Sequence, residues 1–220
     1  MKLARIFAFA IFLAPFAHAD GEPVNMVFNN VNGANDGHYY VSPYYGTMGT
    51  QSVVLFCDDI KNEISFGEKW SANVTNLGTA LSTPDGFANT RYGGVTGSPV
   101  FSDASVAYQE AAWLTTQFAS NPGDWVNLQY ALWDVMNPGT YGNPDVTLWL
   151  NKAENPSNYT SIDPNNFEII TNVGPLYLTG QEQEFIVQTP EPGTVALLLC
   201  GALMLVAFSL LRALATAAKA

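Results

Sequence analysis

Residues 121–139 read NPGDWVNLQYALWDVMNPG and hold the clearest secondary-structure signal of the chain. An Asn-Pro-Gly triplet stands at each end, and these residues interrupt helices and favour turns. Between the triplets, apolar side chains recur every three or four residues, at Trp125, Leu128, Leu132 and Met136, and Trp133 widens the stripe. The stretch therefore predicts an amphipathic helix with one buried face.

Helical and strand-forming stretches surround this helix in blocks. Asp103–Phe118 holds helix formers without Gly or Pro, and a third, shorter helix is predicted from Asp145 to about Ala153. Short β-branched or aromatic runs separated by turn signals predict strands on both sides of the helices. They are Val24–Phe28, Gly37–Tyr45, Val53–Phe56, Phe167–Ile170, Leu176–Leu178 and Phe185–Val187. The expected fold class is α+β, a strand-rich domain with a two- to three-helix insertion.

The start of the chain indicates targeting rather than folding. Met1–Ala19 combines a basic start at Lys2 and Arg5 with an apolar run and the small-x-small triplet Ala-His-Ala. That order predicts a secretory signal peptide over residues 1–19, with an uncleaved anchor as the alternative.

The end of the chain carries a second apolar run. Gly193–Leu211 contains 19 residues without a charge, and at 1.5 Å per residue a helix of that length spans about 28 Å. This is close to the thickness of a hydrocarbon core and predicts a single C-terminal transmembrane helix at 193–211, with a buried core helix as the alternative. Arg212 follows directly, so the positive-inside rule places residues 20–192 outside the inner membrane.

Residues 20–192 form a window of 173 residues, large enough for one domain with a core. All 19 acidic residues of the chain fall in this window but only four of the eight basic ones, so its net charge is −15. Such a charge repels phosphate, which excludes nucleic acid as a partner and argues against binding to an anionic membrane surface. The five Trp and ten Tyr also lie here and argue against disorder.

Pro190, Glu191 and Pro192 stand immediately before the C-terminal apolar run, and Arg212 stands immediately after it. In that order, over residues 189–220, they resemble the PEP-CTERM sorting signal of bacteria that have an outer membrane. The resemblance implies that an exosortase-type membrane protease cuts near the Pro-Glu-Pro motif and passes the domain to the cell surface or the extracellular matrix. One arginine stands here where members usually carry a cluster.

Cys57 is the only cysteine of the window, because Cys200 lies in the predicted membrane span. A disulfide within the domain is therefore impossible, and a lone cysteine in an oxidising compartment is buried and inert, paired between chains, or chemically used. Cys57 ends an apolar strand and precedes Asp58 and Asp59. Adjacent carboxylates raise the pKa of a thiol, which disfavours a catalytic thiolate and hence an enzyme.

Gln129 is a polar residue on an apolar helix face. It lies between Leu128 and Leu132 and four residues before Trp133, so it points along the buried side of the predicted helix. An unpaired amide in a core costs about 1–3 kcal/mol, so Gln129 needs a partner, and a hydrogen bond to backbone would satisfy it.

Phe56-Cys57-Asp58, together with Leu128–Trp133, resembles the two-part motif of the thioester domains of bacterial surface adhesins. In that motif an aromatic-Cys pair and an aliphatic-Gln-x-Ala-aliphatic-Trp segment supply an internal thioester. The resemblance implies a domain over residues 20–188 in which Cys57 Sγ is bonded to the side-chain carbonyl carbon of Gln129, with ammonia lost. Such a bond acylates amines on a target polymer, protein or cell. Trp113, Trp125 and Trp133 are expected to shield it and Tyr130 to gate it.

Two other interpretations stay open at this point. One is a non-covalent module that binds extracellular matrix or polysaccharide, with Cys57 buried and inert and with a stacking surface of Tyr39, Tyr40, Tyr44 and Tyr45. The other is a secreted cysteine enzyme with His38 as the base, which the acidic neighbourhood of the cysteine disfavours. The sequence has no phosphate-binding loop and no His/Cys metal spacing, so no cofactor or metal is expected.

Overall fold

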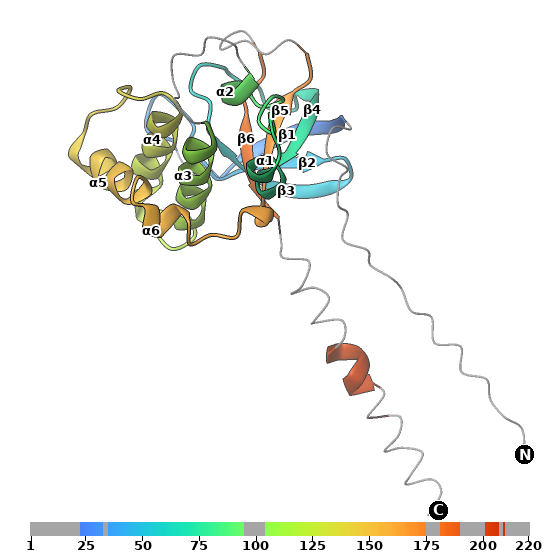
Figure 1. The fold of residues 1–220 in the computed structure, drawn as a ribbon. Helices are drawn as coiled ribbons and strands as arrows, with labels where there is room; N and C mark the ends of the chain where they lie inside the picture. The colour runs from blue at the N-terminus through green and yellow to red at the C-terminus, as the bar shows by residue number, and fades with distance from the viewer. Residues whose placement is uncertain are drawn as a thin grey trace, which may run out of the picture. The chain divides into compact units, whose positions relative to one another are not determined.

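The computed structural model of the chain describes residues 23–32, 35–94, 104–174, 181–189, 201–206 and 209 (Figure 1). The chain divides into two units, Asp20–Glu191 and the two ends, Met1–Ala19 with Pro192–Ala220, and each unit is considered by itself. The predicted signal peptide at 1–19 lies outside the described residues, as do the predicted sorting residues Pro190, Glu191, Pro192 and Arg212.

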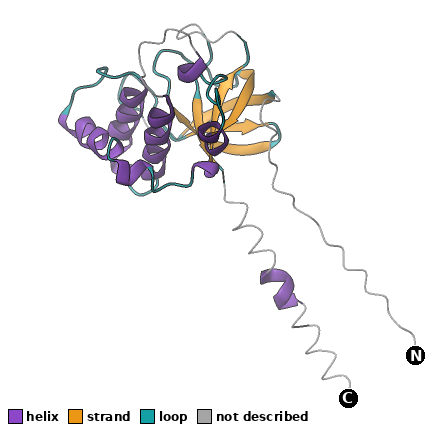
Figure 2. Cartoon of the chain, viewed as in Figure 1, coloured by secondary structure: helices purple, strands orange, loops and turns teal. Residues whose placement is uncertain are grey.

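The unit Asp20–Glu191 is built on a closed barrel of antiparallel strands in the order β1-β2-β3-β6-β5-β4, drawn in orange in Figure 2. Pairing of β1 with β4 closes the barrel, so its strands offer no free edge. The strands are β1 (Val24–Val31), β2 (Tyr44–Met48), β3 (Gln51–Cys57), β4 (Lys69–Asn76), β5 (Phe167–Asn172) and β6 (Phe185–Gln188).

Two hydrophobic clusters share the strands between them. We call the first the barrel cluster; its members include Met26, Phe28, Tyr44, Val53, Leu55, Cys57, Trp133 and Phe185. The second, the helical cluster, includes Phe56, Trp113, Leu114, Leu128, Leu132, Trp149, Ile169 and Ile186. Successive residues of a strand point to opposite faces, so Leu55 and Cys57 join the barrel cluster and Phe56 between them joins the helical one. The end of β3 is therefore buried on both faces.

The helices lie between β4 and β5 in the chain and pack together beside the barrel (Figures 1 and 2). Helix α4 contacts α3, α5 and β3, so it joins the helical layer to the barrel. The helices are α1 (Leu77–Ser82), α2 (Arg91–Gly94), α3 (Ala104–Gln117), α4 (Trp125–Met136), α5 (Pro144–Ala153) and α6 (Pro156–Tyr159), with single 3-10 turns η1 (Pro122–Asp124) and η2 (Pro164–Asn166).

Local signals set the helix ends. The turn η1 leads directly into α4, and Gly139 shortly after its end has a φ of +83°, a conformation that favours glycine. At α5 the side chain of Asn143 accepts a hydrogen bond from Val146 N, and Pro144 takes the first helical position.

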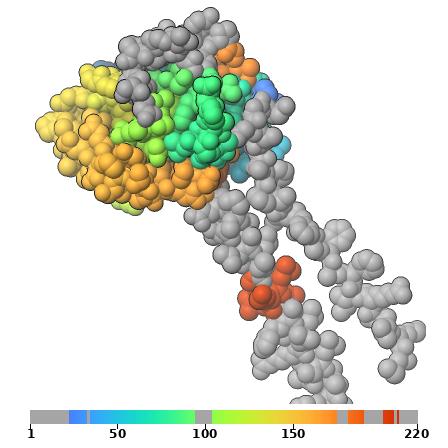
Figure 3. All heavy atoms as spheres, in the orientation of Figure 1, coloured from blue at the N-terminus to red at the C-terminus, as the bar shows by residue number. Residues whose placement is uncertain are grey.

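The short helix α1 packs against η2, and Figure 3 shows the two segments, green and orange, in contact on one face. Glycine at position 78 suits this approach, because a Cβ there would displace the side chain of Asn165. The contact ties the start of the helical insertion to its end.

The α+β class and the helices expected at 103–118, between the two Asn-Pro-Gly triplets of 121–139, and at 145–153 are confirmed by α3, α4 and α5. Three short helices, α1, α2 and α6, were not expected, because four to six residues are too few to show a helical period. The strand expected at 37–45 is wrong over most of its length, since β2 begins only at Tyr44. Before it, Asp36 Oδ1 accepts hydrogen bonds from His38 N and Tyr39 N and forms a turn. The strand expected at 176–178 lies outside the described residues.

In the C-terminal unit, residues 201–206 and 209 are helical. Within the described residues, no helix has the length and apolar character needed to cross a membrane. Most of the expected transmembrane helix at 193–211 falls outside the described residues, so that helix stays a prediction.

Candidate functional site

Cys57 is the last residue of β3 and its thiol lies in the barrel cluster, fully buried and free of any disulfide. Trp133 from α4 reaches into the same cluster, and its Nε1–H donates to Cys57 Sγ at 3.4 Å. The thiol in turn donates to the backbone carbonyl of Asp59 at 3.4 Å. The sulfur is therefore held between the helix and the loop that follows its own strand.

Gln129 is also fully buried and meets Cys57 although the two lie 72 residues apart. Its Nε2 donates to the carbonyl oxygen of Cys57 at 2.6 Å, and its Oε1 accepts from Ser42 N at 2.9 Å. Because the carbonyl of Cys57 can only accept and the N–H of Ser42 can only donate, these two groups determine which end of the amide is oxygen and which is nitrogen. The position of the side chain is thus set at both ends.

Ser42 closes these contacts into a ring. Its Oγ accepts a hydrogen bond from Cys57 N at 3.0 Å, while its own N–H donates to Gln129. The ring joins the loop before β2, the end of β3 and helix α4, and each of its three residues is fully buried. Sequence reasoning missed Ser42, since nothing in a Ser-Pro pair within a tyrosine-rich stretch marks it as a core residue.

Aromatic rings cover the sulfur from the side of Trp133. Tyr130 stacks on Trp133 at 5.7 Å between ring centroids and on Tyr141 at 4.0 Å, and Tyr39 meets Trp133 edge-on at 5.6 Å. Trp133 therefore contacts the cysteine, and Tyr130 packs on Trp133. Tyr39 and Tyr141 complete the cover.

Trp113 and Trp125 lie in a different part of the domain. Trp113 belongs to the helical cluster, with its ring 6.5 Å from that of Trp149. Trp125 packs against the same cluster, and its Nε1 donates to the carbonyl of Phe118. The structure brings neither ring into the cluster that holds Cys57.

The surroundings of the thiol oppose ionisation. Burial raises the pKa of Cys57 well above its ordinary value, and the carboxyls of Asp59 and Asp58 raise it further, against the lowering effect of the Trp133 hydrogen bond. The sulfur is thus held as a neutral thiol, unlike a catalytic thiolate. His38 is the only histidine of the described residues, and its backbone N–H donates a hydrogen bond to Asp36 Oδ1.

The loop after Cys57 enters a buried charge cluster of Asp58, Asp59, Arg91 and Glu184. Arg91 Nε lies 2.8 Å from Asp59 Oδ2, and Arg91 N donates to Glu184 Oε2 at 2.7 Å. Glu184 also accepts from Tyr108 at 2.6 Å and from Thr171. These bonds tie the residues that follow Cys57 to α2, α3, β5 and the start of β6, and so fix the position of the cysteine.

Three carboxyls face one guanidinium in this cluster. The Asp58 carboxyl is buried without a hydrogen-bond partner, and burial, Glu184 and Asp59 raise its pKa well above the ordinary range. Burial also raises the pKa of Glu184 and of Asp59, although Arg91 opposes the shift in both. The cluster therefore favours a proton on Asp58.

Asp58→Asn is expected to weaken the pH dependence of stability. Because the pKa of folded Asp58 lies above the unfolded value of about 3.9, the folded state keeps a proton over a pH range in which the unfolded state has lost it. The stability that this proton contributes is present at acidic pH and is lost as pH rises through the folded pKa. Urea denaturation should show that the free energy of unfolding falls as pH rises above the unfolded pKa of about 3.9, and that this fall is smaller in the variant.

Glu110 contributes to the same fall, because burial and Glu154 raise its pKa to about 7, but it is unchanged in the variant. Asp145→Asn, at an exposed position at the start of α5, is the matched control and should leave the slope as it is. Equal slopes for Asp58→Asn and the natural protein would show that Asp58 ionises as it does in the unfolded chain.

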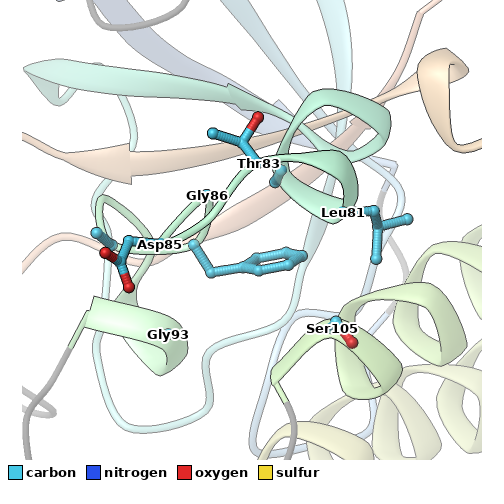
Figure 4. A pocket seen from close by; sticks show the side chains of 9 residues that line it. Leu81, Thr83, Asp85, Gly86, Gly93 and Ser105 are labelled. Carbon is cyan, nitrogen blue, oxygen red and sulfur yellow. The ribbon is translucent and has the colours of Figure 1, made fainter.

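A separate hollow of about 460 Å³ lies between the loop after α1 and the start of α3. Figure 4 shows Asp85 and Gly93 on one side of it and Leu81 and Ser105 on the other. The described residues of its lining include none of Ser42, Cys57 and Gln129, and they offer one carboxylate without a cysteine, histidine or cation. Within the described ranges, no group of three or more His, Cys, Asp or Glu side chains is placed to hold a metal ion.

Comparison with known proteins leaves the site to be interpreted from its own geometry. No protein-family model, no curated protein and no solved structure matches the chain.

Proposed function

We propose that the chain is an adhesion protein whose unit Asp20–Glu191 carries an internal thioester between Cys57 and Gln129 and uses it to acylate amines on a surface or matrix polymer. The proposal includes export by the signal peptide at 1–19 and anchoring by a C-terminal helix at 193–211. It also includes release near Pro190-Glu191-Pro192 by an exosortase-type protease, to the cell surface or extracellular matrix. The adhesion step is not enzymatic, because each molecule uses up its thioester when it acylates an amine.

The hydrogen-bonded ring of Ser42, Cys57 and Gln129 is the observation that supports the thioester most strongly. It holds a primary amide against a buried cysteine with no water-exposed atom on either residue. In bond formation, Cys57 Sγ attacks Gln129 Cδ, the Cδ–Nε2 bond breaks, and the nitrogen leaves as ammonia with the thiol proton. Fixed proximity of this kind supplies much of what such a reaction needs.

Ser42 N has a role that persists after the bond forms. Its N–H donates to Gln129 Oε1, which becomes the carbonyl oxygen of the thioester. A backbone donor on that oxygen stabilises the negative charge that develops there when a nucleophile attacks the carbonyl carbon. The same donor therefore assists formation of the thioester and its later opening by an amine.

Burial protects the bond in the meantime. A thioester is an activated acyl group that water hydrolyses, and the ring lies beneath Trp133, Tyr130 and Tyr141. Exclusion of water lets the acyl group survive until an amine reaches it.

Trp133→Phe is expected to shorten the life of the thioester several-fold. Phenylalanine keeps an aromatic ring in the barrel cluster but removes the Nε1–H that bonds Cys57 Sγ and leaves a gap beside the sulfur. Hydrolysis adds one water to the mass and leaves a carboxylate at position 129 with a free thiol. Intact mass followed over time measures it.

Trp113→Phe is the matched control for this measurement, since Trp113 lies in the helical cluster. The two variants also decide between the shield expected from the sequence, which included Trp113, and the shield seen around Cys57. Equal hydrolysis rates in both variants would contradict a protective role specific to Trp133.

Opening by an amine tests the proposed function itself. Methylamine added to the full-length protein should become attached to Gln129 and release one titratable thiol, and Cys57→Ala should show neither change. Before any amine is added, one more titratable thiol in the unfolded natural protein than in unfolded Cys57→Ala protein would show that no thioester had formed.

A non-covalent binding module is the second candidate. Tyr39, Tyr40 and Tyr45 are 46%, 48% and 37% exposed and would supply its stacking surface, whereas Tyr44 is only 3% exposed and packs in the barrel. In this candidate, the bonds of Gln129 to backbone groups satisfy its amide without any covalent step. The absence of a thioester would favour this candidate.

A further inference from the structure

A cavity of about 430 Å³ adjoins the candidate thioester through Trp133. Trp133 is part of its wall and also donates to Cys57 Sγ. Gln183 lines it too, and Gln183 Nε2 lies 3.4 Å from the carbonyl of Asp59, the same oxygen that accepts from the thiol. Trp133 thus contacts the sulfur directly, and Gln183 shares a hydrogen-bond acceptor with it.

Exposed aromatic rings form the outer walls of this cavity. Tyr39, Tyr40 and Phe66 are 46%, 48% and 54% exposed, although apolar rings are normally buried. Phe66 stacks on Phe28 at 5.5 Å, and the ring of Tyr40 lies 5.5 Å from that of Phe66. Such walls suit an aliphatic chain, and their faces attract a cation.

The charges of the lining have one sign. Glu63 is its only carboxylate, is exposed to solvent, and lies among described lining residues that include no lysine or arginine. His38 is the one imidazole among them. An exposed carboxylate and aromatic walls thus lead from solvent to Trp133, the residue that contacts the sulfur.

We propose that this cavity is the entry site for the attacking amine and selects an unbranched primary alkylamine that carries a second positive charge at its far end. The inference rests on the proposed function and deepens it by naming the substrate class. Glu63 holds the far cation at the mouth, the chain lies against Tyr39, Tyr40 and Phe66, and the reacting nitrogen arrives at Trp133. The side chain of Trp133 must move aside for the nitrogen to pass.

The attacking amine loses two protons in the reaction. The ammonium gives one proton to His38 and then to solvent, and the neutral nitrogen attacks Gln129 Cδ. The new N–Cδ bond forms, the Cδ–Sγ bond breaks, and the sulfur takes the second proton of the nitrogen to become the Cys57 thiol. The product is an amide that joins the substrate to residue 129.

Three amines separate the contributions to this selectivity. Methylamine, pentylamine and cadaverine are reacted with full-length protein, and opening is followed by intact mass as a rate per amino group. Pentylamine should react about tenfold faster than methylamine, because its chain contacts the aromatic walls. Cadaverine should react about three- to fivefold faster than pentylamine, because only cadaverine offers Glu63 a second charge.

Two variants assign these differences to residues. Glu63→Gln should remove the advantage of cadaverine over pentylamine, whereas Glu154→Gln, at an exposed carboxylate outside the cavity, should leave all three rates unchanged. Phe66→Ala should reduce the advantage of pentylamine over methylamine. Equal rates for the three amines in a protein that carries the thioester would overturn the entry site and leave the proposed function standing.

Binding to the cavity can also be measured without the thioester. In Cys57→Ala protein, cadaverine should shift the NMR signals of His38 and Tyr39 and do so less in Cys57→Ala/Glu63→Gln protein. Absence of any shift at these residues would overturn the entry site. A natural protein that has the full mass of its sequence would overturn the proposed function, and with it the acylation step. It would not overturn a cation site that this titration detects.

Discussion

Replacing Arg91 with methionine is expected to destabilise the protein by about 3–5 kcal/mol near pH 8, the cost of removing one partner of a buried ion pair. Arg91 is fully buried, pairs with Asp59 at 2.8 Å and is the only buried cation among the described residues opposite Asp58, Asp59 and Glu184. The loss is a large part of the stability of an ordinary domain. Urea denaturation of the full-length protein measures it.

The loss should be smaller near pH 5, because carboxyls whose folded pKa values are already raised take up protons more readily once the guanidinium is gone. This pH signature separates the electrostatic role of Arg91 from simple packing. Arg91→Lys keeps the charge but not the bond from Nη2 to Asn172, and should fall between the natural protein and Arg91→Met. An equal loss at both pH values would contradict the electrostatic explanation.

Gln129→Ala is expected to destabilise the protein by about 2–5 kcal/mol, because it leaves Ser42 N and the carbonyl of Cys57 buried without the partner that Gln129 supplies. It also leaves space between α4 and β3. The variant should in addition carry a free thiol at Cys57 and the full mass of its sequence. Thermal or urea unfolding together with thiol titration of the unfolded chain measures both effects.

Gln109→Ala is the matched control, since Gln109 also lies on a helix but bonds a carbonyl of its own helix, that of Ser105. Its effect should stay within about 0.5 kcal/mol. An unchanged free energy of unfolding in Gln129→Ala would show that the ring contributes nothing to the stability of the fold.

The helices of the insertion were predictable because each long helix shows its period and its ends. Asn-Pro-Gly triplets bracket α4, and Asn143 with Pro144 starts α5. The closed barrel was not predictable in the same way. Its closure depends on pairing of β4 with β1 and β5, and Lys69–Asn76 is rich in Ser and Asn, which are poor indicators of a strand.

The meeting of Cys57 with Gln129 was expected from the motif, and the structure places the two in hydrogen-bond contact. Ser42 was missed because its contribution is a backbone N–H and a hydroxyl in a loop, positions that no period marks. Trp113 and Trp125 were expected beside the sulfur because a period shows which face of a helix is buried. It does not show whether that face meets the barrel or a neighbouring helix, and these two rings meet helices.

The intact mass of the full-length protein tests the thioester most directly, when compared with Cys57→Ala protein prepared in the same way so that any cleavage of the chain ends affects both. If the thioester forms, the mass difference between the natural protein and the variant is smaller than that of the cysteine-to-alanine substitution by one ammonia. A proteolytic digest of the natural protein should then yield one peptide pair joined through Cys57 and Gln129. A natural protein whose mass differs from that of the variant by the cysteine substitution alone, and which shows one more titratable thiol than the variant on unfolding, would contradict the thioester.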